Sequence, residues 1–97
     1  MQVIIDGRFV LDEADLHHRI AGALGYGPSP CRDIESLRER LASGDPRPVQ
    51  LIWINASVIR MALGRARFEK FVATLETIES QESGRPWRER FVFRLFE

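Results

Sequence analysis

Apolar positions along the chain fall into two patterns, short continuous or alternating runs and stripes at helical spacing. The short runs are rich in β-branched and aromatic residues, and they predict three strands, near residues 3–5, 49–54 and 90–96. The stripes repeat every three or four residues, and they predict four helices, near residues 16–24, 34–41, 55–63 and 68–78. The clearest stripe is the last one, so we expect Phe71, Val72 and Leu75 to lie in the core.

The order of these elements predicts an α/β fold. Helices that separate consecutive strands imply crossover connections, which join parallel rather than antiparallel strands. We therefore expect a small three-stranded parallel sheet packed with about four helices, in a single domain over residues 1–97. The middle strand, VQLIWI, is almost wholly apolar and is expected to be buried on both faces.

Local signals predict where the helices begin and end. Asp12 and Asp33 precede apolar stripes and are candidate N-caps, and Asn55 could cap the third helix in the same way. Gly25 is a natural terminator for the first helix. Residues 80–89 are expected to form a polar loop before the last strand.

Composition narrows the possible function classes. Fourteen basic residues balance fourteen acidic ones, so no global field attracts the chain to nucleic acid or anionic lipid. The one cysteine, Cys31, allows no intrachain disulfide, which fits a reducing cytoplasm. The first residues do not resemble a signal peptide, and no apolar run approaches the roughly 20 residues needed to span a bilayer. We therefore expect a cytoplasmic protein without membrane contact.

Two acids in the segment DIESLRER are the first candidate functional residues. Glu35 and Glu39 are four positions apart, so on a helix they share a face. Arg38 borders the apolar stripe beside them. Spacing alone leaves two interpretations open, a solvated face with carboxylates paired to neighbouring arginines, or a pair of carboxylates offered to a cationic partner.

Other candidate chemistry is weak. His17 and His18 are adjacent and would point about 100° apart on a helix, so they cannot easily share a metal ion, and we expect His17 to be exposed or half-buried. Cys31 is interpreted as a small loop residue rather than a nucleophile, and no phosphate-binding loop is present. No metal or cofactor is expected. The C-terminal basic residues are interpreted either as charges that protect an edge strand or as a single-stranded nucleic-acid site around Trp87; they are Arg85, Arg88, Arg90 and Arg94.

Four stretches in this order resemble the barstar family of ribonuclease inhibitors. They are VIIDGRFV followed by DLH, the helix IESLRERL, the strand PVQLIWI, and ALG before the long last helix. The resemblance covers nearly the whole chain. It implies a three-stranded parallel sheet with packed helices and an intracellular inhibitor that blocks the active site of a secreted ribonuclease, rather than an enzyme.

The resemblance also implies which residues bind the partner. Glu35 and Glu39 occupy the two acidic positions of the family's binding helix, and Asp33 occupies the position before it. Tyr26 and Arg38 would flank these acids. Glu76 is the nearest candidate for a further family acid on the last helix.

The expected partner is a ribonuclease-like toxin, bound one-to-one by a chain that is a monomer when free. Two alternatives stay open. The chain could be a protein-interaction or regulatory module of the same fold without a nuclease target, or a small nucleic-acid binder that uses its C-terminal arginines.

Overall fold

The structure, a computed structural model, describes residues 1–26, 33–44 and 46–97. Two α-helices separate each pair of consecutive strands. In chain order the elements are β1 (Gln2–Asp6), α1 (Glu13–Leu24), α2 (Ile34–Ala42), β2 (Val49–Ile54), α3 (Ala56–Leu63), α4 (Arg65–Gln81) and β3 (Phe91–Leu95). Two short 3-10 helices, Gly7–Phe9 and Trp87–Glu89, precede α1 and β3.

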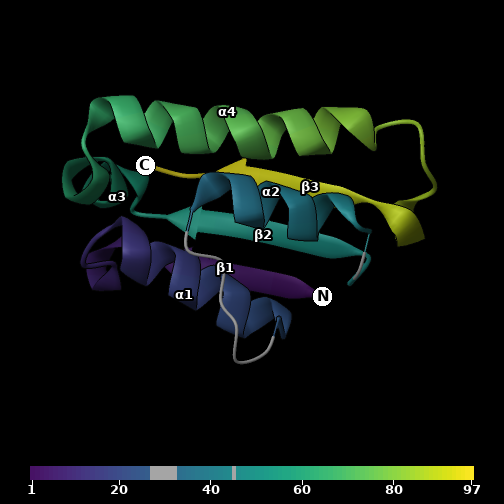
Figure 1. Ribbon diagram of the computed structural model, residues 1–97, viewed down its shortest axis with the longest axis horizontal. Coiled ribbons are helices and arrows are strands. Elements are labelled where there is room, and N and C mark those ends of the chain that lie inside the picture. The colour runs from purple at the N-terminus through teal and green to yellow at the C-terminus, as the bar shows by residue number, and fades with distance from the viewer. Residues whose placement is uncertain (27–32, 45) are drawn as a thin grey trace.

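The strands form one parallel sheet in the order β1-β2-β3, as predicted. Leu51 at the centre of β2 is in register with Val3 on one side and Phe93 on the other. Each crossover places a helix against the sheet, and α2 lies between α1 and α4 over the middle of the sheet (Figure 1). The α/β fold expected from the order of elements is therefore confirmed.

The prediction that β2 is buried on both faces was wrong. Its residues alternate between fully buried and half-buried, and the fully buried ones are Val49, Leu51 and Trp53. The main helices cover the face of the sheet that these residues occupy (Figure 1). The opposite face carries Ile52 and Ile54 half-buried, so their apolar character does not reflect a second covering layer.

Trp53 is the centre of the core. Its ring lies edge-on to Phe71 of α4 at 5.4 Å and to Phe93 of β3 at 5.1 Å between centroids. The predicted stripe of α4 is confirmed at Phe71 and Leu75, which are fully buried, while Val72 is half-buried against the same cluster. The core thus joins the sheet to its longest helix through aromatic contacts, which add to the free energy of apolar burial.

A polar corner joins the ends of β1 and β2. Asn55 does precede α3, but its side chain does not cap the helix; it donates to Asp6 Oδ1 at 2.9 Å. Asn55 adopts a left-handed conformation with φ of 52°, which asparagine tolerates better than most residues. Beside it, a Cβ on Gly7 would lie 2.1 Å from the Asn55 carbonyl oxygen, so only glycine fits there.

The polar loop is shorter than residues 80–89. α4 continues through Ser80 to Gln81, because its last turn keeps the helical hydrogen-bond pattern into Glu82 and Ser83. The polar residues Ser80 and Gln81 thus belong to the exposed last turn of the helix rather than to a loop.

We expect Leu75→Ala to lower the free energy of unfolding by about 2–5 kcal/mol, because it leaves a cavity beneath α4. Chemical denaturation monitored by circular dichroism measures this change. The matched control is Leu11→Ala, since the Leu11 side chain is 79% exposed. Equal effects of the two substitutions would contradict the placement of Leu75 in the core.

Candidate functional site

Helix α2 presents the predicted acids, and Asp33 fixes where this helix begins. The Asp33 carboxylate accepts a hydrogen bond from the Ser36 backbone N–H at 2.8 Å, as an N-cap does. The same hydrogen bond holds the pKa of Asp33 below its ordinary value. The apolar side of the helix is anchored in the core by Ile34, Leu37 and Leu41. Asp33 therefore has a structural role at the start of the acidic face.

Glu35 and Glu39 lie on the exposed face of α2, but their surroundings differ. The Arg38 guanidinium donates to Glu35 Oε2, with Nη2 at 2.8 Å. Both side chains are about half exposed, 52% for Arg38 and 60% for Glu35, so solvent screens this pair. Within the residues that the structure describes, the Glu39 side chain forms no hydrogen bond or ion pair. The face thus offers one carboxylate that is shared with an arginine and one that is available to a partner.

Tyr26 lies on a different flank of α2 from these acids. Its side chain is buried, 6% exposed, and the Arg40 guanidinium lies over its ring at 4.5 Å from the centroid. Arg40 is 100° from Glu39 and 140° from Glu35 at 100° per residue. The structure therefore brings Tyr26 together with Arg40, and it does not place Tyr26 beside Glu35 and Glu39.

Glu76, the candidate acid on α4, is exposed. On α4, Arg67 and Phe71 contact Glu13 and His17 of α1, so this flank faces the other helices of the layer. Glu76 is nine residues from Arg67, which places it on the opposite side of α4. The spacing along α4 therefore places Glu76 away from the flank of this helix that contacts α1, and its role in partner binding stays a prediction.

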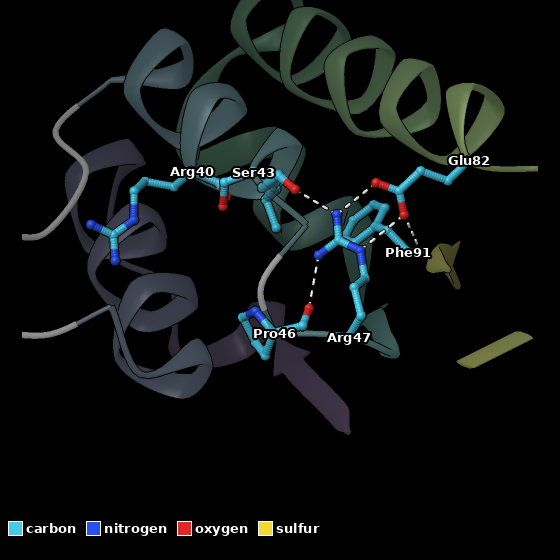
Figure 2. Close-up of polar contacts among 7 residues, drawn as sticks. Arg40, Ser43, Pro46, Arg47, Glu82 and Phe91 are labelled. Atoms are coloured by element: carbon cyan, nitrogen blue, oxygen red, sulfur yellow. Dashed lines mark hydrogen bonds and ion pairs between the residues drawn. The ribbon is translucent and has the colours of Figure 1, made fainter. Parts of the chain in front are cut away.

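The C-terminal end of α2 is held by a buried ion pair that sequence reasoning missed. Arg47 Nε and Nη2 donate to the two carboxylate oxygens of Glu82 at 2.9 and 2.7 Å, and the side chains are only 6% and 5% exposed (Figure 2). Arg47 also donates to the carbonyl oxygens of Leu41, at the end of α2, and Pro46. Glu82 accepts from the Phe91 backbone N–H at 2.8 Å, which links the pair to β3.

This pair could not be recognised from residue types alone. Arg47 lies between two prolines and Glu82 follows a polar helix end, and charged residues in such segments are normally exposed. Burial is possible because nearly every donor and acceptor finds a partner. The signal that could have been used is position along the chain, since Arg47 lies just before the predicted second strand and Glu82 lies in the predicted loop before the third, and these two strands are neighbours in the sheet.

His17 corrects a second expectation. It is 1% exposed rather than at the surface, and its ring lies 5.0 Å from that of Phe71. Among the described residues neither ring nitrogen has a hydrogen-bond partner, and burial lowers the pKa of the imidazole. The buried face of α1 is wider than the stripe of leucine and isoleucine residues that the sequence pattern indicated. It is wider because the helix packs against the sheet and against its neighbouring helices.

The remaining candidates are Cys31, a metal site and the C-terminal arginines. Cys31 lies outside the described residues. Among the residues that the structure does describe, no three His, Cys, Asp or Glu side chains are arranged to hold a metal ion. Of the C-terminal arginines, Arg94 pairs with Glu79 at 2.7 Å and Arg90 donates to the Arg85 carbonyl, so two of these guanidiniums are already engaged within the chain.

Within residues 1–26, 33–44 and 46–97, no helix has the length and apolar character required to cross a bilayer. The sequence pattern of one protein family, described as Barstar (barnase inhibitor), matches residues 1–96. A search among curated proteins gives no significant match.

Burial alone would raise the pKa of Glu82, but the hydrogen bonds from Arg47 and Phe91 outweigh it and lower the pKa below 4.5. The pair therefore stabilises the fold at pH values above the pKa that Glu82 has in the unfolded chain. This contribution is lost as the pH falls through the lower pKa that Glu82 has in the folded protein. We expect Glu82→Gln to lower the free energy of unfolding at neutral pH by about 3–5 kcal/mol, because Arg47 stays buried without a counter-charge.

Denaturation over a pH series measures both effects. In the wild type the stability falls on acidification, and in Glu82→Gln that part of the fall is absent. Glu69→Gln is the matched control, because Glu69 pairs with Arg65 in an exposed position and its loss should change little. A Glu82→Gln variant that is as stable as the wild type at neutral pH would contradict the role assigned to the pair.

Proposed function

We propose that this chain, which belongs to the barstar family of barnase inhibitors, binds a ribonuclease-like toxin in the cytoplasm and blocks its active site. The partner is bound one-to-one, and the chain itself catalyses no reaction. Glu35 and Glu39 contact the cationic groups that would otherwise hold RNA phosphates. Asp33 and Arg38 border this contact, and Tyr26 supports its flank through Arg40.

The observation that carries this proposal is the exposure of the Glu39 carboxylate. Its carboxylate is exposed on a helix whose other side is fully packed, and no described residue neutralises it. A carboxylate can take the place of a phosphate in an Arg or Lys site through charge-assisted hydrogen bonds. Because α2 is fixed at both ends, little conformational entropy is lost when the partner binds.

The Glu35–Arg38 pair supports a role for Arg38 in partner choice. Arg38 cancels one of the two negative charges on the face. The electrostatic attraction between this face and a strongly cationic cleft is therefore weaker than two free carboxylates would give. A partner can engage Glu35 by displacing Arg38, or it can offer a carboxylate to Arg38 beside a cation for Glu39.

The zero net charge of the chain favours a second candidate, a partner that is not a nuclease. In this case α2 still forms the interface, but the bound protein has no RNA-cleaving activity. Capture of the partner with the intact chain as bait, followed by a ribonuclease assay of the captured protein with and without added chain, distinguishes the two candidates.

We expect Glu39→Gln to weaken binding to the captured toxin by an amount equivalent to about 2–5 kcal/mol, because a cation in the interface loses its counter-charge. The melting temperature should stay close to that of the wild type, since the exposed carboxylate contributes little to folding. Isothermal titration calorimetry and a thermal melt on the same preparation measure both quantities.

The matched comparison is Glu76→Gln, which removes an exposed acid from the side of α4 opposite Arg67. Binding should change little in this variant. If Glu76→Gln weakens binding and Glu39→Gln does not, the interface lies on the outer side of α4 rather than on α2.

A further inference from the structure

Arg40 of α2 differs from the other arginines on the four α-helices. Each of the others that the structure describes forms an ion pair with a carboxylate; they are Arg19, Arg38, Arg60, Arg65 and Arg67. Within the described part of the chain, Arg40 pairs with no carboxylate, although its side chain is exposed. Its positive charge is therefore open to an acid from outside the chain.

Two contacts with Tyr26 hold the Arg40 guanidinium in place. The guanidinium carbon lies over the Tyr26 ring at 4.5 Å from the centroid, and Nη2 donates to the Tyr26 carbonyl oxygen at 3.4 Å. Tyr26 is itself buried. In Figure 2 the Arg40 side chain extends away from the Arg47–Glu82 pair, so the two arginines make separate contacts. A guanidinium that is already oriented loses little conformational entropy when it binds a carboxylate.

Glu39, the residue before Arg40, carries an unmatched charge of the opposite sign. The two side chains do not face each other, because successive residues of a helix point about 100° apart. Glu39 lies about 140° or more around the helix from each of the buried residues Ile34, Leu37 and Leu41, whereas Arg40 lies about 60° from Leu37. Glu39 therefore points away from the core, and Arg40 lies along the flank of α2 beside Tyr26.

We propose that the partner bound by α2 presents a carboxylate to Arg40 beside the cation that it presents to Glu39. This inference rests on the proposed function, because it describes the same interface. A carboxylate matches the planar guanidinium through two parallel hydrogen bonds. Two opposite charges on one helix require complementary charges in a matching arrangement, so they fix the orientation of the partner and disfavour a surface of a single sign.

The acid beside Arg40 favours a carboxylate on a protein over the phosphates of a nucleic acid. A row of phosphates that reached Arg40 would also approach Glu39 and be repelled by it. A ribonuclease site offers the required mixture of charges, because the cations that hold the phosphate lie near a general base, and aspartate and glutamate can act as general bases. The zero net charge of the chain fits a partner surface of mixed charge better than a uniformly cationic one.

The affinity of the Arg40→Gln variant for the protein captured with the wild-type chain tests the inference. Isothermal titration calorimetry should show binding weakened by about tenfold to hundredfold, the range that a charge-assisted hydrogen bond gives. The matched control is Arg65→Gln, which removes the same charge from an exposed position at the start of α4 and should leave the affinity unchanged.

A partner site of uniformly positive charge gives the opposite result, because the loss of Arg40 removes a repulsion and tightens binding. Tighter or unchanged binding of Arg40→Gln therefore overturns the inference. The titration is repeated with partner washed in high salt to remove nucleic acid. An effect of Arg40→Gln that disappears after this wash identifies a phosphate contact and also overturns the inference.

Two further variants separate charge from packing and from the proposed function. Arg40→Lys keeps the positive charge and should bind more tightly than Arg40→Gln. Equal affinities of these two variants would show that the Tyr26 contact rather than the charge matters, which contradicts the inference. Glu39→Gln tests the proposed function separately: if it weakens binding and Arg40→Gln does not, the acidic face stands and the carboxylate assigned to the partner is wrong.

Discussion

The buried ion pair between Arg47 and Glu82 is the interaction on which the arrangement of the helical layer depends. Arg47 precedes β2 and bonds to the end of α2 through the Leu41 carbonyl, while Glu82 follows α4 and bonds to the first residue of β3. Four elements therefore meet at two side chains (Figure 2). An ion pair of this kind is costly to bury unless its donors and acceptors are satisfied, and here they bond both to each other and to the backbone.

This constraint has a consequence for the candidate site. α2 is only nine residues long, too short to be stable alone in water, so its geometry depends on what holds it. Asp33 caps one end, the Arg47 contact fixes the other, and three apolar residues bury the inner face. The outward direction of Glu39 follows from these contacts rather than from any interaction of the carboxylate itself. The face is thus set by the cap, the Arg47 contact and the buried apolar residues rather than by the carboxylates that it presents.

The sequence predicted the parts of this structure that rest on periodicity and capping, and it missed those that rest on long-range polar contacts. Three strands, four helices and the caps at Asp12 and Asp33 follow from local pattern. The burial of His17 and Glu82 does not, because it depends on neighbours that are distant in sequence. Glu35 and Glu39 were located correctly on an exposed helical face, but the pairing of Glu35 with Arg38 was one of two open interpretations.

The central claim is that acids on α2 occupy the place of RNA phosphates in the active site of a partner. Competition measures this most directly: the affinity of the chain for the captured ribonuclease is determined in the presence of increasing concentrations of a mononucleotide that binds the active site of the enzyme. The account predicts that the nucleotide and the chain exclude each other, so that the apparent dissociation constant rises in proportion to nucleotide concentration. Simultaneous binding of the two, with an unchanged dissociation constant, would contradict it.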